Sequence, residues 1–258
     1  MKHLLLIFVY LCSFSISSLG QTQKLPLLLG EKFILTSEIL NQDREILVRL
    51  PNGYTAGKDS YEVHFILDGE ITFKAYTGVV DIMVAAELIP DVIVVGIPNV
   101  DRRFDLNPRQ NGGKFLEFIT RELIPLIDSE YRTKSERLIA GYSMAGNYAI
   151  YAFLKGHDSF DKFLSGSPYR LDLYDENQIS LLPDAFQSPK AVYTSIGKED
   201  MQEQVQTFMD FCKMLESKSM DGFTFRHELI DGRNHDTNIL PNWQDGLAFL
   251  YSNLKPNP

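Results

Sequence analysis

Residues 137–146 read Arg-Leu-Ile-Ala-Gly-Tyr-Ser-Met-Ala-Gly, an apolar run that enters a turn of small residues around Ser143. A serine that attacks a carbonyl must project its hydroxyl from a tight strand-to-helix turn, and small side chains two residues before and after it let the backbone fold back. Gly141 and Ala145 occupy these two positions. The stretch therefore predicts a nucleophile elbow with Ser143 at its tip.

The sequence on both sides of the elbow alternates between short apolar runs and longer helical patterns, which is typical of a mainly parallel sheet covered by helices. Two runs separated by three polar residues, 32–40 and 44–50, predict an N-terminal hairpin. Further strands are predicted at 62–67, 91–97, 138–140, 160–164, 191–196 and 223–229, and helices at 72–88, 115–131, 144–154, 202–215 and 243–254. This order predicts the α/β class: an α/β-hydrolase fold with a mainly parallel twisted sheet of about eight strands, an N-terminal antiparallel hairpin and helices on both faces.

The N-terminus has the composition of an export signal. A basic start, Met1-Lys2-His3, precedes an apolar stretch at 4–14 and small residues up to Gly20. We therefore expect a signal peptide at 1–20 and a single α/β-hydrolase domain at 21–258, exported to the periplasm or secreted, with an N-terminal anchor as the alternative. No later apolar run is long enough to cross a bilayer, so no integral membrane span is expected after cleavage.

Charge and cysteine content narrow the classes of partner. The net charge of -9, which becomes more negative if Lys2 is removed, argues against nucleic acid and anionic membranes as partners. Loss of 1–20 would remove Cys12 and leave Cys212 alone, so no intrachain disulfide is expected. Cys212 is predicted to be a buried apolar filler, because nothing near it in sequence would activate a thiol.

A serine nucleophile needs a histidine to take its proton and an acid to orient that histidine, in the chain order Ser, acid, His. Only His235, in the loop at 231–237 after the last predicted strand, fits this order well. The other four histidines fail on position: His3, His64, His157 and His227 lie in the signal, in strands, or just after the elbow helix.

Two carboxylates follow the strand before that histidine, at Glu199 and Asp200. Asp200 is the preferred acid because it stands three residues beyond the turn glycine, Gly197, which leaves room for the chain to turn toward His235. Glu199 remains an alternative, and both could instead be solvated residues at the start of a helix.

The tetrahedral oxyanion needs two backbone N–H donors. Met144, directly after the nucleophile, supplies one, and the loop after the third strand supplies the other. Glu70 is the preferred second donor and Gly69 the alternative, whereas Asp68 is expected to brace the turn. No residue pattern implies a metal or an organic cofactor.

Several motifs together resemble the putative-esterase family, which holds the enterochelin and salmochelin esterases, S-formylglutathione hydrolase, feruloyl esterases and the mycolyltransferase antigens. They are Phe65-Ile66-Leu67-Asp68-Gly69, Val94-Val95-Gly96-Ile97-Pro98-Asn99, Arg102-Arg103-Phe104-Asp105-Leu106-Asn107-Pro108, Gly112-Gly113-Lys114-Phe115, Glu122-Leu123-Ile124-Pro125, Tyr131-Arg132-Thr133 and Gly141-Tyr142-Ser143-Met144-Ala145-Gly146. The resemblance covers residues 30–255 and is closest to the branch of siderophore esterases.

The resemblance implies roles for particular residues. Ser143 and His235 match the nucleophile and base, and Asp200 matches the acid position, which some siderophore esterases lack or fill with glutamate. Ala145 departs from the commoner glycine but matches the mycolyltransferase branch. Arg102 and Asp105 match a loop near the mouth of the site, where they would contact substrate or form an ion pair that braces the loop.

The expected function is hydrolysis of a carboxylic ester through an acyl-enzyme, with a small-molecule ester of siderophore type or another type as substrate. Acyl transfer, thioester or peptide-bond cleavage on the same triad, and a non-catalytic binding protein with a hydrolase fold, remain alternatives. The irregular-looking segment 168–189 is expected to be a lid or a pocket wall. Four aromatic residues are candidates either for an aromatic-ester pocket or for simple packing: Tyr142, Tyr169, Tyr174 and Trp243.

Overall fold

The strand that leads into the elbow lies at the centre of an eight-stranded sheet, whose order is β1-β2-β4-β3-β5-β6-β7-β8. The computed structural model describes residues 29–252, so the expected signal peptide at 1–20 lies outside the described residues. β1 (Glu31–Ser37) pairs antiparallel with β2 (Gln42–Arg49), and β2 pairs antiparallel with β4, whereas all other neighbours are parallel. The predicted mainly parallel sheet with its N-terminal hairpin is confirmed.

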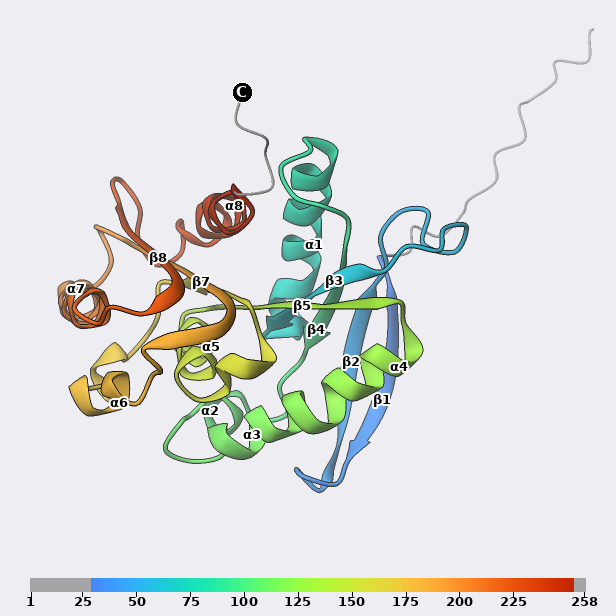
Figure 1. The fold of residues 1–258 in the computed structure, drawn as a ribbon, viewed down its shortest axis with the longest axis horizontal. Coiled ribbons are helices and arrows are strands. Elements are labelled where there is room, and N and C mark those ends of the chain that lie inside the picture. Colours follow the sequence, from blue (N-terminus) through green and yellow to red (C-terminus); the bar gives the residue numbers. More distant parts are fainter. Residues whose placement is uncertain (1–28, 253–258) are drawn as a thin grey trace, which may run out of the picture.

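The other predicted strands and helices follow in the predicted order, and two short helices that were not predicted, α2 and α6, are added to them (Figure 1). The strands are β3 (Tyr61–Leu67), β4 (Val92–Ile97), β5 (Thr133–Tyr142), β6 (Lys162–Gly166), β7 (Ala185–Gly197) and β8 (Asp221–Ile230). The helices are α1 (Gly69–Ala85), α2 (Arg102–Asp105), α3 (Gly112–Phe118), α4 (Ile124–Glu130), α5 (Met144–Gly156), α6 (Glu176–Ser180), α7 (Gln202–Glu216) and α8 (Ile239–Leu250). Within residues 29–252, no helix has the length and apolar character needed to cross a membrane.

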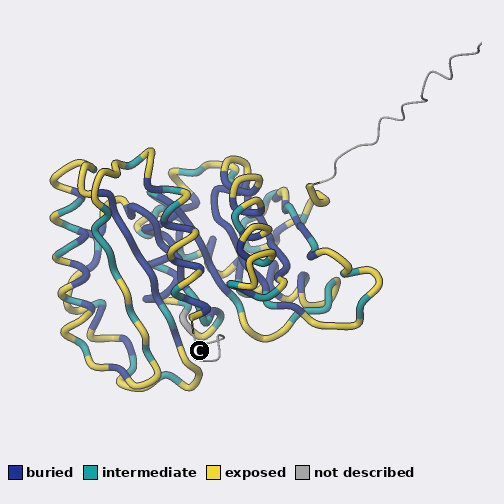
Figure 2. Tube along the Cα trace, turned by 90° about the horizontal axis from the view of Figure 1, so that it is seen from above, coloured by how far each residue is buried: buried dark blue, intermediate teal, exposed yellow. Residues whose placement is uncertain are grey.

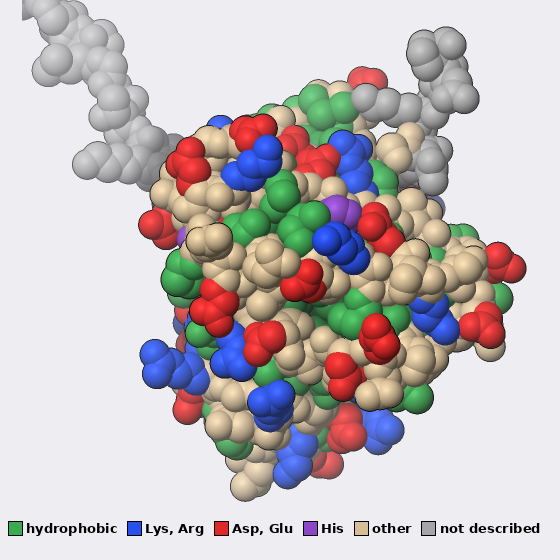
Figure 3. Space-filling model, turned by 90° about the vertical axis from the view of Figure 1, so that its left-hand side faces the viewer, with side chains coloured by type: hydrophobic (Ala, Val, Ile, Leu, Met, Phe, Trp, Pro, Cys, Tyr) green, Lys and Arg blue, Asp and Glu red, His purple; other side chains and the backbone are tan. Residues whose placement is uncertain are grey.

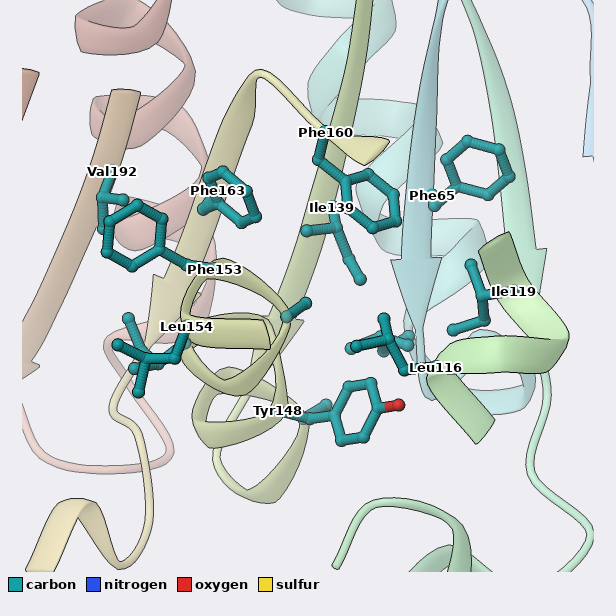
Figure 4. Packing of buried hydrophobic residues seen from close by; sticks show 14 of the residues in the cluster. Phe65, Leu116, Ile119, Ile139, Tyr148, Phe153, Leu154, Phe160, Phe163 and Val192 are labelled. Carbon is teal, nitrogen blue, oxygen red and sulfur yellow. The ribbon is translucent and has the colours of Figure 1, made fainter. Parts of the chain in front are cut away.

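Helices cover both faces of the sheet, with α1 and α8 on one side and α3, α4 and α5 on the other (Figure 1). Successive strand residues point to opposite faces, so Phe65 of β3 packs toward α5 while Ile66 packs toward α1 and α8. Edge-to-face contacts link Phe65, Phe160, Phe163 and Phe153 in a row between the sheet and α5 (Figure 4). The strand centres are buried and the outer helix faces exposed (Figure 2). This packing holds α5 firmly behind the elbow.

The single helix predicted over 115–131 is instead α3 and α4 joined by a π-helical segment, Ile119–Leu123. Pro125 lies in the first turn of α4. A proline has no N–H, and its ring clashes with the carbonyl four residues earlier, here that of Arg121 in the π-helical segment. The wider turn accommodates the proline while Phe118 stays fully buried.

The expectation that 168–189 is irregular throughout is wrong. The segment holds a 3₁₀ turn at Leu171–Leu173 and the helix α6, and β7 begins at Ala185 rather than at 191. A capping box starts α6, in which the Asp175 side chain accepts from the N–H of Gln178 and the Gln178 side chain accepts in return. Part of the segment is therefore ordered by its own polar side chains.

His64, which the sequence placed in a strand, lies in a hydrogen-bonded chain inside the core. Its Nδ1 is 2.9 Å from the Tyr76 hydroxyl and its Nε2 is 2.7 Å from the Tyr251 hydroxyl. Tyr251 in turn bonds to Glu62, which pairs with Lys162 at 2.9 Å. Burial, with a smaller contribution from the charge of Lys162, lowers the pKa of His64 to about 3. The imidazole is therefore neutral near pH 7.

Cys212 is buried in α7, and this burial raises the pKa of its thiol. The prediction of a buried, apolar cysteine is confirmed.

Candidate active site

Ser143 stands alone between the end of β5 and the start of α5, with a left-handed backbone at φ 62°. This conformation costs a non-glycine residue of order 1–3 kcal/mol and persists only where the surroundings enforce it. Here the Ser143 N–H donates to the Gly166 carbonyl at 2.8 Å, and the Ser143 carbonyl accepts from the Asn147 N–H at 2.9 Å. The elbow is thus held by the neighbouring strand and by its own helix.

The small-residue requirement of the elbow is strict at Gly141. A Cβ at that position would lie 2.1 Å from the carbonyl oxygen of Ala145, well inside van der Waals contact. Ala145 carries its own methyl group in a fully buried site. Alanine is therefore accommodated two residues after Ser143, whereas only glycine fits two residues before it.

His235 lies between Ser143 and Asp200 and contacts both. Its Nε2 is 2.9 Å from the Ser143 Oγ, and its Nδ1 is 3.2 Å from Oδ2 of Asp200. The Asp200 side chain is 2 % exposed and that of His235 is 39 % exposed. The structure thus brings together the three residues that the sequence singled out for a Ser-His-Asp triad, with a geometry suited to proton transfer.

Close packing of two loops decides which carboxylate meets His235. The Glu199 N–H donates to the Arg233 carbonyl at 2.8 Å, and a Cβ on Gly197 would lie 2.1 Å from that same oxygen. With the backbone fixed this way, Glu199 is exposed and Asp200 faces the imidazole.

Tyr142 anchors the loop that carries His235. Its hydroxyl lies 2.6 Å from the His235 carbonyl and 2.9 Å from Oγ of Ser167, and Asn238 donates to that same Oγ at 3.3 Å. Burial raises the pKa of Tyr142 to about 12, so the hydroxyl remains a donor to the carbonyl. From the sequence, Tyr142 was a candidate only for a pocket or for packing. The one sequence signal for its role in holding the His235 loop was its position directly before Ser143. No sequence pattern pointed to such a role for Asn238.

Two helix N-termini meet beside Ser143, because β3 and β5 are neighbours with Ile66 opposite Ala140. The first N–H groups of a helix have no intrahelical acceptor. Met144 opens α5, and Gly69 and Glu70 open α1, while the next two N–H groups of α1 bond to the Asp68 carbonyl. All the expected oxyanion donors, with Gly69 and Glu70 still as alternatives, therefore start helices at this edge of the sheet.

Asp68 braces the turn that opens α1. It has a left-handed backbone at φ 54°, and its carboxylate accepts from Nε and Nη2 of Arg102 at 2.9 and 2.7 Å. The hydrogen bond to Asp68 raises the pKa of Arg102. Asn99 bridges the carboxylates of Asp68 and Glu70 at 2.7 and 3.0 Å. Arg102 thus supports the turn that presents Gly69 and Glu70.

Asp105 is not available to a substrate, which corrects one of the two expectations for this loop. It is 1 % exposed and forms an ion pair of 2.8 Å with Arg44, which is itself fully buried. Arg44 also donates to the Pro98 carbonyl at 3.0 Å and lies over the ring of Phe115. Arg102 and Asp105 therefore both brace the loop, but through different partners, Asp68 and Arg44.

A cleft of about 190 Å³ opens beside Met144. Its lining is Leu106, Asn107, Pro108, Arg109, Met144, Asn147, Tyr169, Arg170 and Leu173. Of the aromatic candidates, Tyr169 is 39 % exposed and lines this cleft, whereas Tyr174 and Trp243 are buried in the core. The segment that follows β6 is thus a wall of the cleft.

Larger hollows lie elsewhere in the described chain. One of about 590 Å³ is lined by residues such as Ser135 and Lys162 at the amino ends of strands, and one of about 810 Å³ lies beside Arg49 of β2. Neither is lined by Ser143, Asp200 or His235. Over α6 and α7, acidic and basic side chains are interspersed with hydrophobic ones, without a field of one sign (Figure 3). In residues 29–252, no group of three or more His, Cys, Asp or Glu side chains is placed to hold a metal ion.

Comparison with solved structures shows the same fold in several hydrolases. An IroE-like serine hydrolase from Shewanella oneidensis matches with a TM-score of 0.79 and 22% identity over 88% of this chain and 82% of that one. The siderophore hydrolase EstA from Aspergillus nidulans matches with a TM-score of 0.75 and 17% identity, over 91% and 99% of the two chains. The enterobactin esterase FES from Shigella flexneri matches with a TM-score of 0.72 and 17% identity, over 89% of this chain and 61% of that longer one.

The α/β-hydrolase prediction is thereby confirmed at the level of the fold. No curated protein sequence matches this chain significantly. A family model described as "Putative esterase" matches residues 37–248, a range that runs from the end of β1 into α8 and includes Ser143, Asp200 and His235. By this match the chain belongs to the putative-esterase family.

Proposed function

We propose that this protein is a serine esterase that hydrolyses a carboxylic ester through an acyl-enzyme. The observation that carries the proposal is the position of His235, whose two ring nitrogens lie 2.9 Å from the Ser143 Oγ and 3.2 Å from the Asp200 carboxylate. Membership of an esterase family supports the same reaction class.

In the proposed mechanism the Ser143 Oγ attacks the ester carbonyl while His235 Nε2 takes its proton. Asp200 keeps the Nδ1 proton of His235 in place and stabilises the imidazolium that forms. The N–H groups of Met144 and Glu70, with Gly69 as the alternative to Glu70, bind the oxyanion. The alcohol leaves with the proton from Nε2, and a water molecule activated by His235 then releases the acid.

The proposed substrate is a small-molecule ester, with siderophore esters as the first class to examine. Two of the similar structures are named as a siderophore hydrolase and an enterobactin esterase, which supports this choice. The cleft beside Met144, at about 190 Å³, has room for part of such a molecule.

The test compares the protein with its Ser143→Ala variant. A fluorophosphonate probe should label Ser143, as mapped by mass spectrometry, and p-nitrophenyl butyrate should be hydrolysed by the protein but not by the variant. Absence of label on Ser143 in folded protein, or equal hydrolysis by both forms, would contradict the proposal and favour a binding protein with a hydrolase fold.

We also propose export, with cleavage near Gly20, on the basis of the basic and apolar N-terminal sequence. N-terminal sequencing of the protein recovered from its native host should begin near Gln21. A mature protein that keeps Met1-Lys2-His3 would contradict this proposal.

A further inference from the structure

The cleft beside Met144 holds more positive than negative charge. Arg109 and Arg170 both line it, and no Asp or Glu does. Arg170 forms a two-bond ion pair with Asp172 at 2.7 and 2.8 Å, whereas Arg109 takes part in no ion pair with the described residues. The pKa of Asp172 is lowered, mainly by the hydrogen bond from Arg170, and the charge of Arg109 adds a small contribution. The charge of Glu203 also acts on Arg170, so the positive charge at this cleft that no ion pair with a described residue neutralises is that of Arg109.

Arg170 is fixed to the helix that begins at the nucleophile. Its carbonyl accepts from Nδ2 of Asn147, and the Asn147 N–H donates to the Ser143 carbonyl, both at 2.9 Å. Its own N–H donates to Gln204 of α7 at 3.1 Å. Its backbone is left-handed at φ 66°, which a non-glycine residue keeps only where contacts enforce it. The position of the Arg170 backbone relative to Ser143 is therefore built into the fold, and its half-exposed side chain is held by Asp172.

The path of the proton in the proposed mechanism indicates that the cleft binds the acyl group of the ester rather than its alcohol. In the proposed mechanism the leaving alcohol receives its proton from His235, so the alcohol must lie next to His235. Neither Ser143 nor His235 lines the cleft, whereas Met144, the expected oxyanion donor directly after Ser143, does. The group that stays bound to Ser143 after the alcohol leaves is the acyl group.

The walls define the kind of acyl chain that fits. Tyr169 and Leu173 offer apolar contacts, and the two arginines offer charged ones. The volume of about 190 Å³ is below the ~300–1,000 Å³ that is usual for ligand pockets. This suits a short acyl chain of a few carbons with an anionic end.

We propose that the cleft selects acyl groups that end in a carboxylate, so that the preferred substrates are monoesters of short dicarboxylic acids, with Arg109 and Arg170 binding the free carboxylate. Arginine is suited to this because its planar fork donates two parallel hydrogen bonds to a carboxylate. The inference rests on the proposed esterase function and adds to it the charge of the acyl group.

The experiment compares two esters of nearly equal size with the same leaving group, p-nitrophenyl hydrogen glutarate and p-nitrophenyl valerate. We expect kcat/KM to favour the glutarate by at least about tenfold at low salt, a difference of about 1.4 kcal/mol. The ratio should fall in 0.5 M NaCl, because exposed charges are screened. It should fall also in Arg109→Gln and in Arg170→Gln, and rise in Asp172→Asn, which removes the competing carboxylate.

Arg103→Gln is the matched control, since Arg103 is exposed, carries the same charge and does not line the cleft. It should keep the wild-type ratio. Valerate hydrolysis with a ratio of one or less would overturn this inference and leave the esterase proposal standing. An equal fall of the ratio in Arg103→Gln would also overturn it, because the effect would then come from the overall field. Failure to hydrolyse either ester, together with absence of fluorophosphonate label on Ser143, would overturn both proposals.

Discussion

Asp200 and His235 are 35 residues apart in sequence, yet Oδ2 of Asp200 lies 3.2 Å from Nδ1 of His235 and only 2 % of the Asp200 side chain is exposed. The neighbouring Glu199 is exposed, and its backbone N–H is bonded to Arg233. Asp200→Asn should therefore lower kcat for p-nitrophenyl butyrate by about 10⁴-fold, because the amide favours the wrong imidazole tautomer. Glu199→Gln is the control and should change kcat by less than about twofold. A larger loss in Glu199→Gln than in Asp200→Asn would assign the acid to Glu199.

Gly141→Ala should damage the elbow, because the added methyl group would lie 2.1 Å from the carbonyl of Ala145. We expect a loss of about 1–3 kcal/mol in the free energy of unfolding, measured by urea denaturation, together with loss of fluorophosphonate labelling. Gly78→Ala is the matched control, since Gly78 lies in α1 with open space around it. That change should stabilise the protein by about 0.5–1 kcal/mol. Equal effects of the two substitutions would argue against a strict requirement for Gly141.

Removing one partner of the buried ion pair Arg44–Asp105 should strongly destabilise the folded protein. Asp105→Ala would leave the fully buried guanidinium of Arg44 without its anion, and we expect the free energy of unfolding to fall by about 3–5 kcal/mol. The control is Glu45→Ala, because Glu45 follows Arg44 in β2 and forms an exposed ion pair with Lys32 of β1. This change should lower the free energy of unfolding by less than about 1 kcal/mol. Both values come from chemical denaturation followed by circular dichroism. A loss in Asp105→Ala no greater than that in Glu45→Ala would contradict the buried arrangement.

Stability should depend on pH through His64. Its pKa in the folded protein is about 3, below the value of 6.5 that applies when it is unfolded, so the unfolded chain takes up the extra proton as the pH falls below 6.5. The stabilisation is fully present above pH 6.5 and is lost progressively toward pH 3. Between pH 7 and pH 5 this group alone should lower the free energy of unfolding by about 2 kcal/mol. Denaturation of the protein and of His64→Gln at both pH values tests this, and equal pH slopes would contradict it.

Sequence patterns were sufficient for the order of elements because strands and helices here have distinct apolar periods, as in the fully buried β4 and the apolar stripe of α3. These patterns were insufficient where a single residue or a side-chain hydrogen bond changes the backbone without changing the spacing of the apolar residues. Pro125 converts part of a helix to a π-helical segment, and the capping box of Asp175 orders a polar segment. In both cases the residue could be identified in the sequence, but its effect on secondary structure depends on the conformation of the surrounding backbone.

The same division applies to the candidate site. Ser143, Asp200 and His235 could be selected from chain order, because the fold places the turns after parallel strands at one edge of the sheet. The partners of Arg102 and Asp105 could not, since Asp68 and Arg44 are more than 30 residues away from them and no period relates these positions. The charge of the cleft was equally hidden, because Arg109 and Arg170 approach each other only after the loops that follow β4 and β6 are folded.

The order of the strands determines at which stage of folding Ser143, Asp200 and His235 come together. Asp200 follows β7 and His235 follows β8, which is the last strand in sequence and lies at one edge of the sheet. A chain synthesised only as far as Gly197 would have the elbow complete and no imidazole beside it. In the proposed mechanism Ser143 therefore gains its base only once β8 has paired with β7, so the chain is expected to remain catalytically silent until this last strand of the sheet has folded.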